Sequence, residues 1–250
     1  MPPLLSAQRR SRLVEMLAES GSIRLEPAAD ALGVSVMTVR RDLDDLVRDG
    51  LARRVRGGAV AAIVPQGFGE RIAARGGAKA EIARKAHDLL PRGGAAAMDA
   101  SSTVGALLAT LDESHELLVV TNSYDNLRTA QARPAVDAIL LGGRLEPRTG
   151  SFVGAQACES AARFHYDRFF TSAAALDPSF GTSETTLEEA EVKRVLAANA
   201  GETVVLADSS KLERLAVARA LRWTDIDILI TELDPDDGRL DVFRDLVDIR

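Results

Sequence analysis

The stretch VSVMTVRRDLDDLVRDGLARRVRGGA, Val34–Ala59, decides the fold of the first part of the chain. Ser35 is a good helix N-cap, apolar residues then recur at helical spacing, and Gly50 ends the pattern. These features predict a helix that begins after Ser35 and ends before Gly50. Its buried face is expected to consist of Val36, Val39, Leu43, Leu46 and Val47.

Two further helical patterns precede this helix. They cover residues 6–20 and 26–32, and Gly33 supplies a tight turn between the second helix and the third. This arrangement predicts a helix-turn-helix motif, whose third helix enters the major groove of DNA. The residues of this helix and its cap that we expect at the DNA are Ser35, Met37, Thr38, Arg40 and Arg41.

A β-ribbon pattern follows the third helix. Residues 51–55 are typical of a strand, and residues 57–60 are typical of a glycine turn with a returning strand. The ribbon predicts a winged helix-turn-helix DNA-binding domain over residues 5–60. The wing arginines that we expect along neighbouring DNA phosphates are Arg53, Arg54 and Arg56.

Charge is unevenly distributed along the chain. Residues 1–60 carry 10 Lys/Arg and 8 Asp/Glu, a net charge of +2, and residues 61–250 carry 21 and 29, a net charge of −8, which together give the total of −6. In an alternative interpretation, the arginines lie on a solvated face and pair with Asp42, Asp44, Asp45 and Asp49. The coincidence of cap, turn, apolar face and wing favours double-stranded DNA as the partner.

Strands and helices alternate in the rest of the chain. The strand patterns cover residues 95–99, 117–121, 138–141, 168–174, 203–207 and 227–230. The helical patterns cover residues 79–90, 103–111, 124–132 and 188–199. This alternation predicts an α/β domain over residues 79–250, with a mostly parallel sheet and helices on both faces. A charged, glycine-containing stretch, residues 61–78, is expected to be a linker.

Polar residues follow several of these strands, at the edge of a parallel sheet where ligands bind. The candidate effector-binding residues are Asp99, Ser101, Ser102, Thr103, Asn122 and Lys211. A serine-rich helix start favours an anion, a lysine neutralises a phosphate, and carboxylate and amide groups bond hydroxyls. Taken singly, the same residues are also typical of a helix cap, a loop and a turn with a solvated lysine.

Other kinds of site are not indicated. The three histidines are dispersed, and the one cysteine, Cys158, excludes an intramolecular disulfide and a cysteine-cluster zinc site. We expect no metal, no cofactor and no catalytic residue. Since no apolar run could span a bilayer and the N-terminus does not resemble a signal peptide, we expect a cytoplasmic protein that binds no membrane.

The sequence resembles the DeoR family of bacterial repressors. Val34–Ala59 matches nearly every fixed position of the family's helix-turn-helix signature. The motifs MDASSTV, VVTNS, LLGG, Gly181-Thr182, EEAEVKR and LADSSKL follow in the family's order and spacing. The resemblance covers nearly the whole chain, and it implies an effector domain related in fold to ribose-5-phosphate isomerase, which senses a phosphorylated sugar or polyol. One departure is Ser101, which stands where the family usually has glycine.

We therefore expect a DNA-binding transcriptional regulator, a repressor of carbohydrate-metabolism genes that a phosphorylated sugar or polyol controls. We also expect a homo-oligomer, a dimer or tetramer, because symmetry-related heads that read two half-sites give usable specificity. The alternative is a sugar-phosphate isomerase with a regulatory DNA-binding head, in which Asp99 or Asp208 is the base and Lys211 binds phosphate. The winged head favours the regulator, since an isomerase has no need of one.

Overall fold

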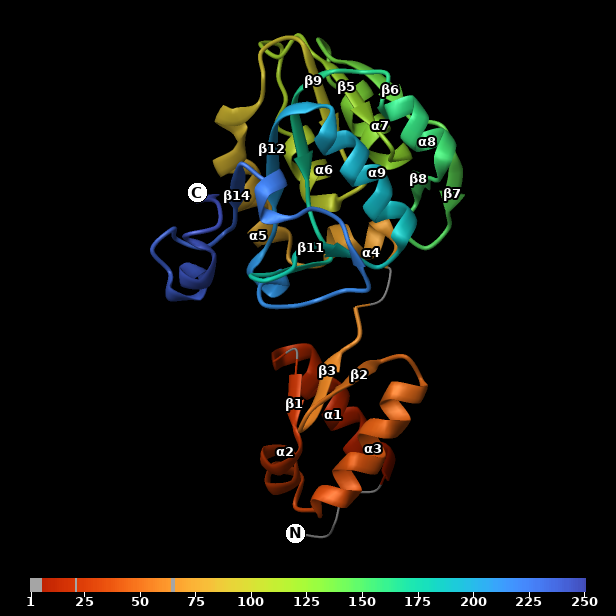
Figure 1. The fold of residues 1–250 in the computed structure, drawn as a ribbon, viewed down its shortest axis with the longest axis vertical. Coiled ribbons are helices and arrows are strands. Elements are labelled where there is room, and N and C mark those ends of the chain that lie inside the picture. The colour runs from red at the N-terminus through yellow and green to blue at the C-terminus, as the bar shows by residue number, and fades with distance from the viewer. Residues whose placement is uncertain (1–5, 21, 64–65) are drawn as a thin grey trace. The chain divides into compact units, whose positions relative to one another are not determined.

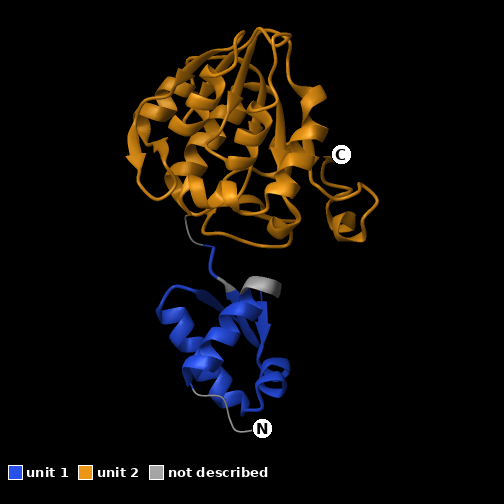
Figure 2. Cartoon of the chain, turned by 180° about the vertical axis from the view of Figure 1, so that it is seen from behind, with its two compact units in different colours: residues 1–64 blue, residues 65–250 orange. Residues whose placement is uncertain are grey.

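The chain forms two compact units in this computed structural model, Met1–Val64 (unit 1) and Pro65–Arg250 (unit 2; Figure 2). The structure describes residues 6–20, 22–63 and 66–250. Each unit has hydrophobic core residues of its own.

Unit 1 packs helices on a small antiparallel sheet (Figure 1). The helices are α1 (Ser6–Ser20), α2 (Leu25–Leu32) and α3 (Val36–Arg48). The strands are β1 (Ser22–Arg24), β2 (Ala52–Val55) and β3 (Gly58–Ala61), in the order β1-β3-β2. The helices and the β2–β3 ribbon lie where the sequence predicts them, whereas β1 is not predicted because three residues are too few to show a period.

The turn between α2 and α3 depends on one glycine and one cap. Gly33 adopts φ +63° and ψ +36°, a left-handed conformation that glycine accepts without steric cost. The Ser35 hydroxyl then accepts a hydrogen bond from the Thr38 N–H at 3.1 Å and starts α3. The buried hydrophobic residues that this geometry brings together are Leu13, Leu17, Ile23, Ala28, Ala29, Leu32, Val39, Leu43, Leu46, Ala52 and Ala59.

The wing turn needs both of its glycines. Gly57 adopts φ +84°, and Gly58 pairs with Arg24 of β1. A Cβ atom at Gly58 would lie 1.9 Å from the Ile23 carbonyl oxygen, which is far inside van der Waals contact. Only glycine therefore allows β3 to approach β1 closely enough to form the sheet.

Unit 2 is built around a sheet of seven strands, counted over the described residues, and every pairing within it is parallel. In sheet order the strands are β15 (Asp248–Ile249), β14 (Ile228–Ile230), β12 (Ala200–Leu206), β9 (Tyr166–Thr171), β4 (Ala95–Met98), β5 (Leu118–Thr121) and β6 (Asp137–Leu140). The helices are α4 (Phe68–Ala73), α5 (Gly76–Ala86), α6 (Ser102–Leu108), α7 (Tyr124–Gln131), α8 (Ala155–Ala161) and α9 (Leu187–Ala198). Short 3-10 turns are η1 (His87–Leu89), η2 (Ser209–Lys211), η3 (Trp223–Asp225) and η4 (Gly238–Phe243).

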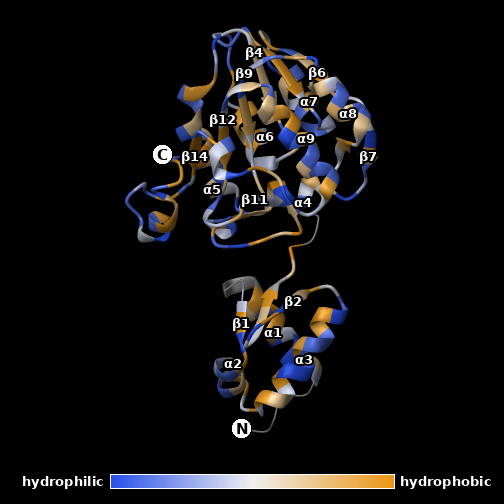
Figure 3. Cartoon of the chain, viewed as in Figure 1, coloured by the Kyte–Doolittle hydropathy of each residue, from blue (hydrophilic) through white to orange (hydrophobic). Residues whose placement is uncertain are grey.

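Both faces of this sheet are apolar, and its central strands are largely hydrophobic (Figure 3). Neighbouring residues of a strand point to opposite faces, so Phe169 packs with α8 and α9 while Phe170 packs with α5 and α6. Val205 and Val204 divide between the two faces in the same way. The predicted parallel α/β sheet with helices on both faces is confirmed.

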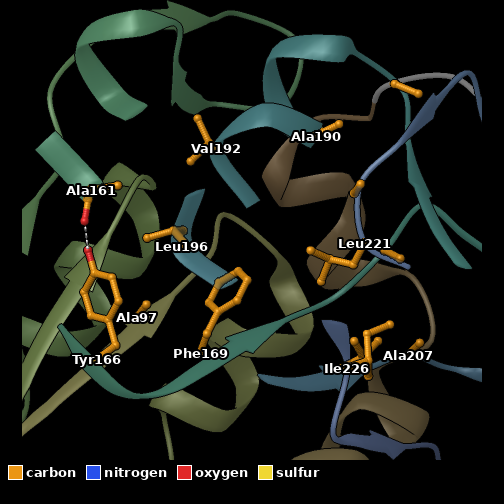
Figure 4. Close-up of a cluster of buried hydrophobic side chains, with 14 of the residues drawn as sticks. Ala97, Ala161, Tyr166, Phe169, Ala190, Val192, Leu196, Ala207, Leu221 and Ile226 are labelled. Atoms are coloured by element: carbon orange, nitrogen blue, oxygen red, sulfur yellow. Dashed lines mark hydrogen bonds between the residues drawn. The ribbon is translucent and has the colours of Figure 1, made fainter. Parts of the chain in front are cut away.

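Figure 4 shows the core beneath α9, where Leu196 packs over Phe169 of β9. Tyr166 is fully buried beside them, and its hydroxyl donates a hydrogen bond to the Ala161 carbonyl at the end of α8 (2.8 Å). The one polar atom of this aromatic side chain is thus satisfied inside the core, which makes its burial favourable.

Several elements differ from the sequence-based expectation. Residues 61–78, expected to be a linker, end β3 and contain α4 and the start of α5, because a glycine-rich composition hides so short a helix. Antiparallel pairs also occur outside the main sheet. They are formed by β7 (Arg144–Glu146) with β8 (Ser151–Val153), and by β10 (Ala175–Asp177), β11 (Gly181–Glu184) and β13 (Ala218–Arg219).

Candidate DNA-binding surface and effector site

The outward side of α3 carries long side chains. Met37 is 65% exposed, and Arg40 and Arg41 are exposed as the sequence predicts. Val36, which was expected in the core, is instead 41% exposed. It is the first residue of the helix, so its side chain lies ahead of the buried stripe that begins at Val39.

Two hydroxyl groups at the start of α3 are held by each other and by the backbone. Ser35 Oγ accepts from the Thr38 N–H, and it lies 2.9 Å from Thr38 Oγ1. The cap therefore fixes both side chains before any partner binds. Hydroxyls at a helix start are common contacts to DNA phosphates.

The aspartates of α3 and its C-cap divide the arginines into two groups. Their ion pairs are Asp42–Arg9 (2.7 Å), Asp44–Arg54 (2.7 Å), Asp45–Arg48 (3.0 Å) and Asp49–Arg10. The arginines of Val34–Ala59 that form no ion pair with any described residue are Arg40, Arg41, Arg53 and Arg56. The alternative interpretation, in which the arginines of this stretch pair with its aspartates, thus applies only to Arg48 and Arg54.

Arg54 fastens the wing to α3. Its Nη2 donates to the Arg40 carbonyl oxygen at 2.9 Å and lies 2.7 Å from Asp44 Oδ1. Because its guanidinium is already bonded within unit 1, Arg54 positions the wing, whereas Arg53 and Arg56 extend from it without an ionic partner among the described residues.

The candidate effector residues share the carboxyl edge of the parallel sheet. Asp99 directly follows β4, Asn122 directly follows β5, and these strands are neighbours. Lys211 ends the η2 turn after β12, and only β9 separates β12 from β4. The connections after β4 and β9 leave towards opposite faces, which is the arrangement that forms ligand-binding crevices in α/β sheets.

Asp99 is 1% exposed and lies at the centre of a hydrogen-bond network. Its Oδ1 accepts from the Ser101 N–H (2.9 Å), and its Oδ2 accepts from Thr171 Oγ1 (2.5 Å) and the Ser172 N–H (3.1 Å). Oδ2 also pairs with Lys193 Nζ of α9 at 2.9 Å. Burial alone would raise the pKa of Asp99, but the Lys193 charge and these hydrogen bonds hold it below its ordinary value.

Lys193 is shared by two buried carboxylates. Besides Asp99, its ammonium donates to Glu184 Oε1 of β11 (2.5 Å) and to the Ser172 carbonyl (2.6 Å). Burial raises the pKa of Glu184 to about 7, and the nearby Glu189 carboxylate adds to the effect, although Lys193 opposes it. The network therefore binds β4, β9, β11 and α9 together beneath the carboxyl edge.

Ser101 caps α6. Its hydroxyl accepts from the Val104 N–H at 3.0 Å, and its backbone adopts φ −86°, which does not require glycine. Serine thus supplies a cap at the position where the family usually has glycine. Ser102 and Thr103 are buried residues whose hydroxyls form no hydrogen bond with the part of the chain that the structure describes.

Two asparagines leave oxygen atoms unused at the same edge. Asn122 donates to the Phe152 carbonyl (3.1 Å), and Asn126 donates to the Asp99 and Ser101 carbonyls (2.7 and 3.1 Å). The Oδ1 atoms of Asn122 and Asn126 are buried and have no hydrogen-bond partner among the described residues. Buried acceptors of this kind are rare without a ligand or water to satisfy them.

Lys211 has a partly buried side chain with no ion pair or side-chain hydrogen bond to the described part of the chain. Burial lowers the pKa of its ammonium, while the Asp208 carboxylate opposes this and the Arg214 charge adds to it. An ammonium in such a place is suited to an anionic ligand.

Sequence reasoning missed Lys193, Glu184 and Asn126. Lys193 stands in the helical pattern EEAEVKR, where a lysine four residues after Glu189 is typical of a solvated pair. Only the packing of α9 against β9 shows that it is buried. Asn126 lies in α7, and its role depends on the neighbouring strand loop.

Metal and membrane sites are not found in the described ranges. Within residues 6–20, 22–63 and 66–250, no group of His, Cys, Asp and Glu could hold a metal ion. None of the helices described there is long and apolar enough to cross a membrane. Cys158 is half-buried on α8 against the core, and burial raises the pKa of its thiol.

Fold and site together define a DNA-binding regulator with a separate ligand-sensing domain. Residues 9–63 match the DeoR-like helix-turn-helix domain, and residues 75–233 match the DeoR C terminal sensor domain. The chain belongs to the DeoR family of transcriptional regulators.

Similar proteins include regulators that align over nearly their full length. The HTH-type transcriptional regulator GlpR of Haloferax volcanii is 32% identical, over 95% of this chain and 92% of the relative. The glycerol-3-phosphate regulon repressor of Escherichia coli K12 is 26% identical, over 95% of each chain. A solved structure of D-ribose-5-phosphate isomerase with phospho-erythronic acid aligns with a TM-score of 0.41 and 16% identity, over 55% of this chain and 54% of that chain.

The buried carboxylates around Lys193 should have opposite effects on stability. The raised pKa of Glu184 means that the folded state keeps a proton which the unfolded state loses above its ordinary pKa of 4.5, so this group lowers stability as pH rises from there to about 7. Glu184→Gln should remove that loss and leave stability at about pH 8 equal to wild type or higher. Asp99→Asn should cost about 3–5 kcal/mol at the same pH, because it breaks a buried ion pair.

Urea unfolding of the two variants and the wild type at about pH 5 and about pH 8 provides the measurement. Each variant removes one of the two carboxylates on the same ammonium, so each is the control for the other. An unchanged pH dependence in Glu184→Gln would show that Glu184 titrates normally in the folded protein.

Proposed function

We propose that the protein represses carbohydrate-metabolism genes in the cytoplasm, and that a phosphorylated sugar or polyol bound at the carboxyl edge of unit 2 controls its affinity for operator DNA. The observation that supports this ligand class most strongly is Lys211, a partly buried ammonium that forms no ion pair with the described residues. The amide oxygens of Asn122 and Asn126 at the same edge, which have no hydrogen-bond partner among the described residues, supply polar contacts that a sugar or polyol requires.

In the proposed complex, the phosphate lies against Ser101–Thr103 and is neutralised by Lys211. Asn122 Oδ1 accepts a hydrogen bond from a ligand hydroxyl, because it is buried and has no hydrogen-bond partner in the described part of the chain. Asp99 already accepts bonds at both oxygens, so it acts on the ligand mainly by orienting the Ser101 N–H.

The names of relatives support the same class of regulation. The glycerol-3-phosphate regulon repressor is named for a polyol phosphate, and a putative aga operon transcriptional repressor of Escherichia coli O157:H7 is 26% identical over 91% of this chain. The isomerase alternative is not favoured. Asp99 would be a weak base because Lys193 lowers its pKa, and the relatives that span the chain are named regulators.

Arg40, Arg41, Arg53 and Arg56, which form no ion pair with the described residues, are proposed to bind DNA. Arg40→Ala and Arg41→Ala should each weaken operator binding by about 1–3 kcal/mol, while Arg53→Ala and Arg56→Ala should weaken binding to all sequences and reduce the salt dependence. Arg48→Ala is the matched control, since Arg48 lies on the same helix but pairs with Asp45. Fluorescence anisotropy with operator and scrambled duplexes over a range of salt concentrations tests this, and equal losses for Arg40→Ala and Arg48→Ala would contradict it.

Lys211 should be required for the effector and not for DNA. Lys211→Ala is expected to lower affinity for the best ligand of a sugar-phosphate panel by about tenfold or more, because a charge-assisted contact is lost. Operator binding without ligand should stay at the wild-type level. Lys85→Ala is the control, because Lys85 donates to the Leu233 carbonyl in the same unit. Calorimetric titration gives the comparison. If Lys211→Ala bound the sugar phosphate with wild-type affinity, the phosphate would not bind at Lys211.

The protein is also proposed to form a symmetric dimer or tetramer. One winged domain is a small module, and two copies related by symmetry read two half-sites one or more helical turns apart. Sedimentation velocity at micromolar concentration should therefore give a dimer or larger species. A monomer with and without operator DNA would exclude this assembly.

A further inference from the structure

Arg71 lies in a short segment that neither family match includes. The helix-turn-helix match ends at residue 63 and the sensor match begins at residue 75. Between them the structure describes residues 66–74, and residues 66–75, named here the α4 segment, begin the described part of unit 2. This segment therefore follows the DNA-binding unit directly along the chain.

Arg71 holds two loops of the carboxyl edge by their backbones. Its Nη1 donates to the Ala100 carbonyl at 2.9 Å, and its Nη2 donates to the Thr149 carbonyl at 2.8 Å. Ala100 immediately precedes the proposed phosphate-binding residues Ser101–Thr103. The α4 segment thus contacts the effector loop itself rather than the body of the sheet.

The Arg71 guanidinium has no anionic partner among the described residues. Its hydrogen-bond acceptors there are neutral carbonyls, and its Nε is buried without an acceptor. The Phe68 ring lies 5.4 Å from the guanidinium carbon, which adds only a weak attraction. A charged group that is half-buried without a counter-charge favours an anion nearby.

Arg71 and Lys211 are close enough for their charges to interact. Burial is the main cause of the lowered pKa of the Lys211 ammonium, and the Arg71 charge adds to it, while the Asp208 and Glu184 carboxylates oppose it. The two cations therefore repel each other, and the nearby carboxylates offset part of that repulsion. An anion bound beside Lys211 would remove that repulsion. It would also offer Arg71 a charge-assisted hydrogen bond, which is stronger than a bond to a neutral carbonyl.

Arg75 ties the α4 segment to the other side of the site, and Lys79 holds the end of α4 together. Arg75 Nε pairs with Asp208 Oδ1 at 3.1 Å, and its Nη2 donates to Ser209 Oγ at 3.3 Å. The Lys79 ammonium donates to the Arg71 and Ala74 carbonyls, which holds the end of α4 together. The α4 segment is therefore bonded to the loop after β4 and to the loop after β12, between which the proposed ligand would lie.

We propose that Arg71 binds the anionic group of the effector as a second cation beside Lys211, and that its movement from the Ala100 and Thr149 carbonyls to that anion shifts α4 and so transmits ligand binding to the DNA-binding unit. This inference rests on the proposed function, because it needs an anionic ligand at this edge. A ligand changes an equilibrium only through contacts that differ between the two states, and the exchange of carbonyl for phosphate at Arg71 is such a difference.

The test measures coupling rather than binding alone. Operator affinity of the full-length protein is determined with and without saturating glycerol 3-phosphate, ribose 5-phosphate, glucose 6-phosphate and inorganic phosphate. In the wild type at least one of these probes should change operator affinity by about tenfold, in the usual range for coupled sites. In Arg71→Gln the change should fall below about twofold, while operator affinity without ligand stays at the wild-type level.

Arg133→Gln is the matched control. Arg133 is also partly buried with an Nε that has no described partner, but it lies after α7 and away from the carboxyl edge. This variant should keep the full wild-type response. Full coupling in Arg71→Gln would overturn the proposal, as would an equal loss of coupling in Arg133→Gln. If no probe binds the wild type, the proposed function fails. If a probe binds the wild type and the Arg71→Gln variant responds equally, only the role of Arg71 fails.

Hydrogen exchange on the wild type tests the same proposal without a substitution. The Arg71 and Ala74 amides donate within α4 to Gly67 and Glu70, each at 3.0 Å. Their exchange rates should change when the active probe binds, while those of α8 stay constant. Unchanged exchange in α4 at saturating ligand would overturn the proposal even if Arg71→Gln failed to fold.

Discussion

The buried pair between Asp99 and Lys193 is the interaction on which the sensing unit depends. Asp99 directly follows β4, whose next helix covers one face of the sheet, and Lys193 comes from α9 on the other face. The pair therefore joins the two layers at the point where the strand connections diverge. A buried charge that lost its partner would be unstable, so the pair fixes the relative position of the loops after β4 and β9.

This constraint separates residues that build the edge from residues that remain available at it. Asp99, Lys193 and Ser101 are bonded within the protein, whereas the Lys211 ammonium and Asn122 Oδ1 have no ion pair or hydrogen bond to the described residues. The same division holds in unit 1. There, Arg54 and Arg48 are paired within the unit, and Arg40 and Arg41 have no ionic partner in the described residues. Both units thus combine a rigid, internally satisfied frame with a few charged groups that can meet a partner.

The local features of the sequence predicted much of this fold. The cap at Ser35, the turn at Gly33 and the helical period of α3 are short-range signals. The central strands of unit 2 contain continuous runs of apolar residues, which the sequence also shows. The carboxyl-edge location of Asp99 and Lys211 also followed from their positions after predicted strands of a parallel sheet. These predictions needed only contacts between residues close in the chain or the general rule for parallel sheets.

What could not be predicted depends on contacts between distant residues. Lys193 looks like a solvated helix residue until α9 packs on the sheet, and Arg71 lies in a glycine-rich stretch whose composition resembles a linker. Strand β1 is defined by its pairing with β3, and this pairing is possible only because Gly58 has no side chain. Val36 was assigned to the core because the apolar period includes it, although its place at the helix start exposes it.

The bond from Arg54 to the Arg40 carbonyl has a consequence for how operator preference can diverge. The acceptor is a main-chain atom, so the bond does not depend on which side chain occupies position 40. In the proposed complex with DNA, substitutions at the outward positions of α3 would therefore alter the bases that are read while the wing keeps its place beside the helix. The contact that holds the wing would then be independent of the side chains proposed to read the operator.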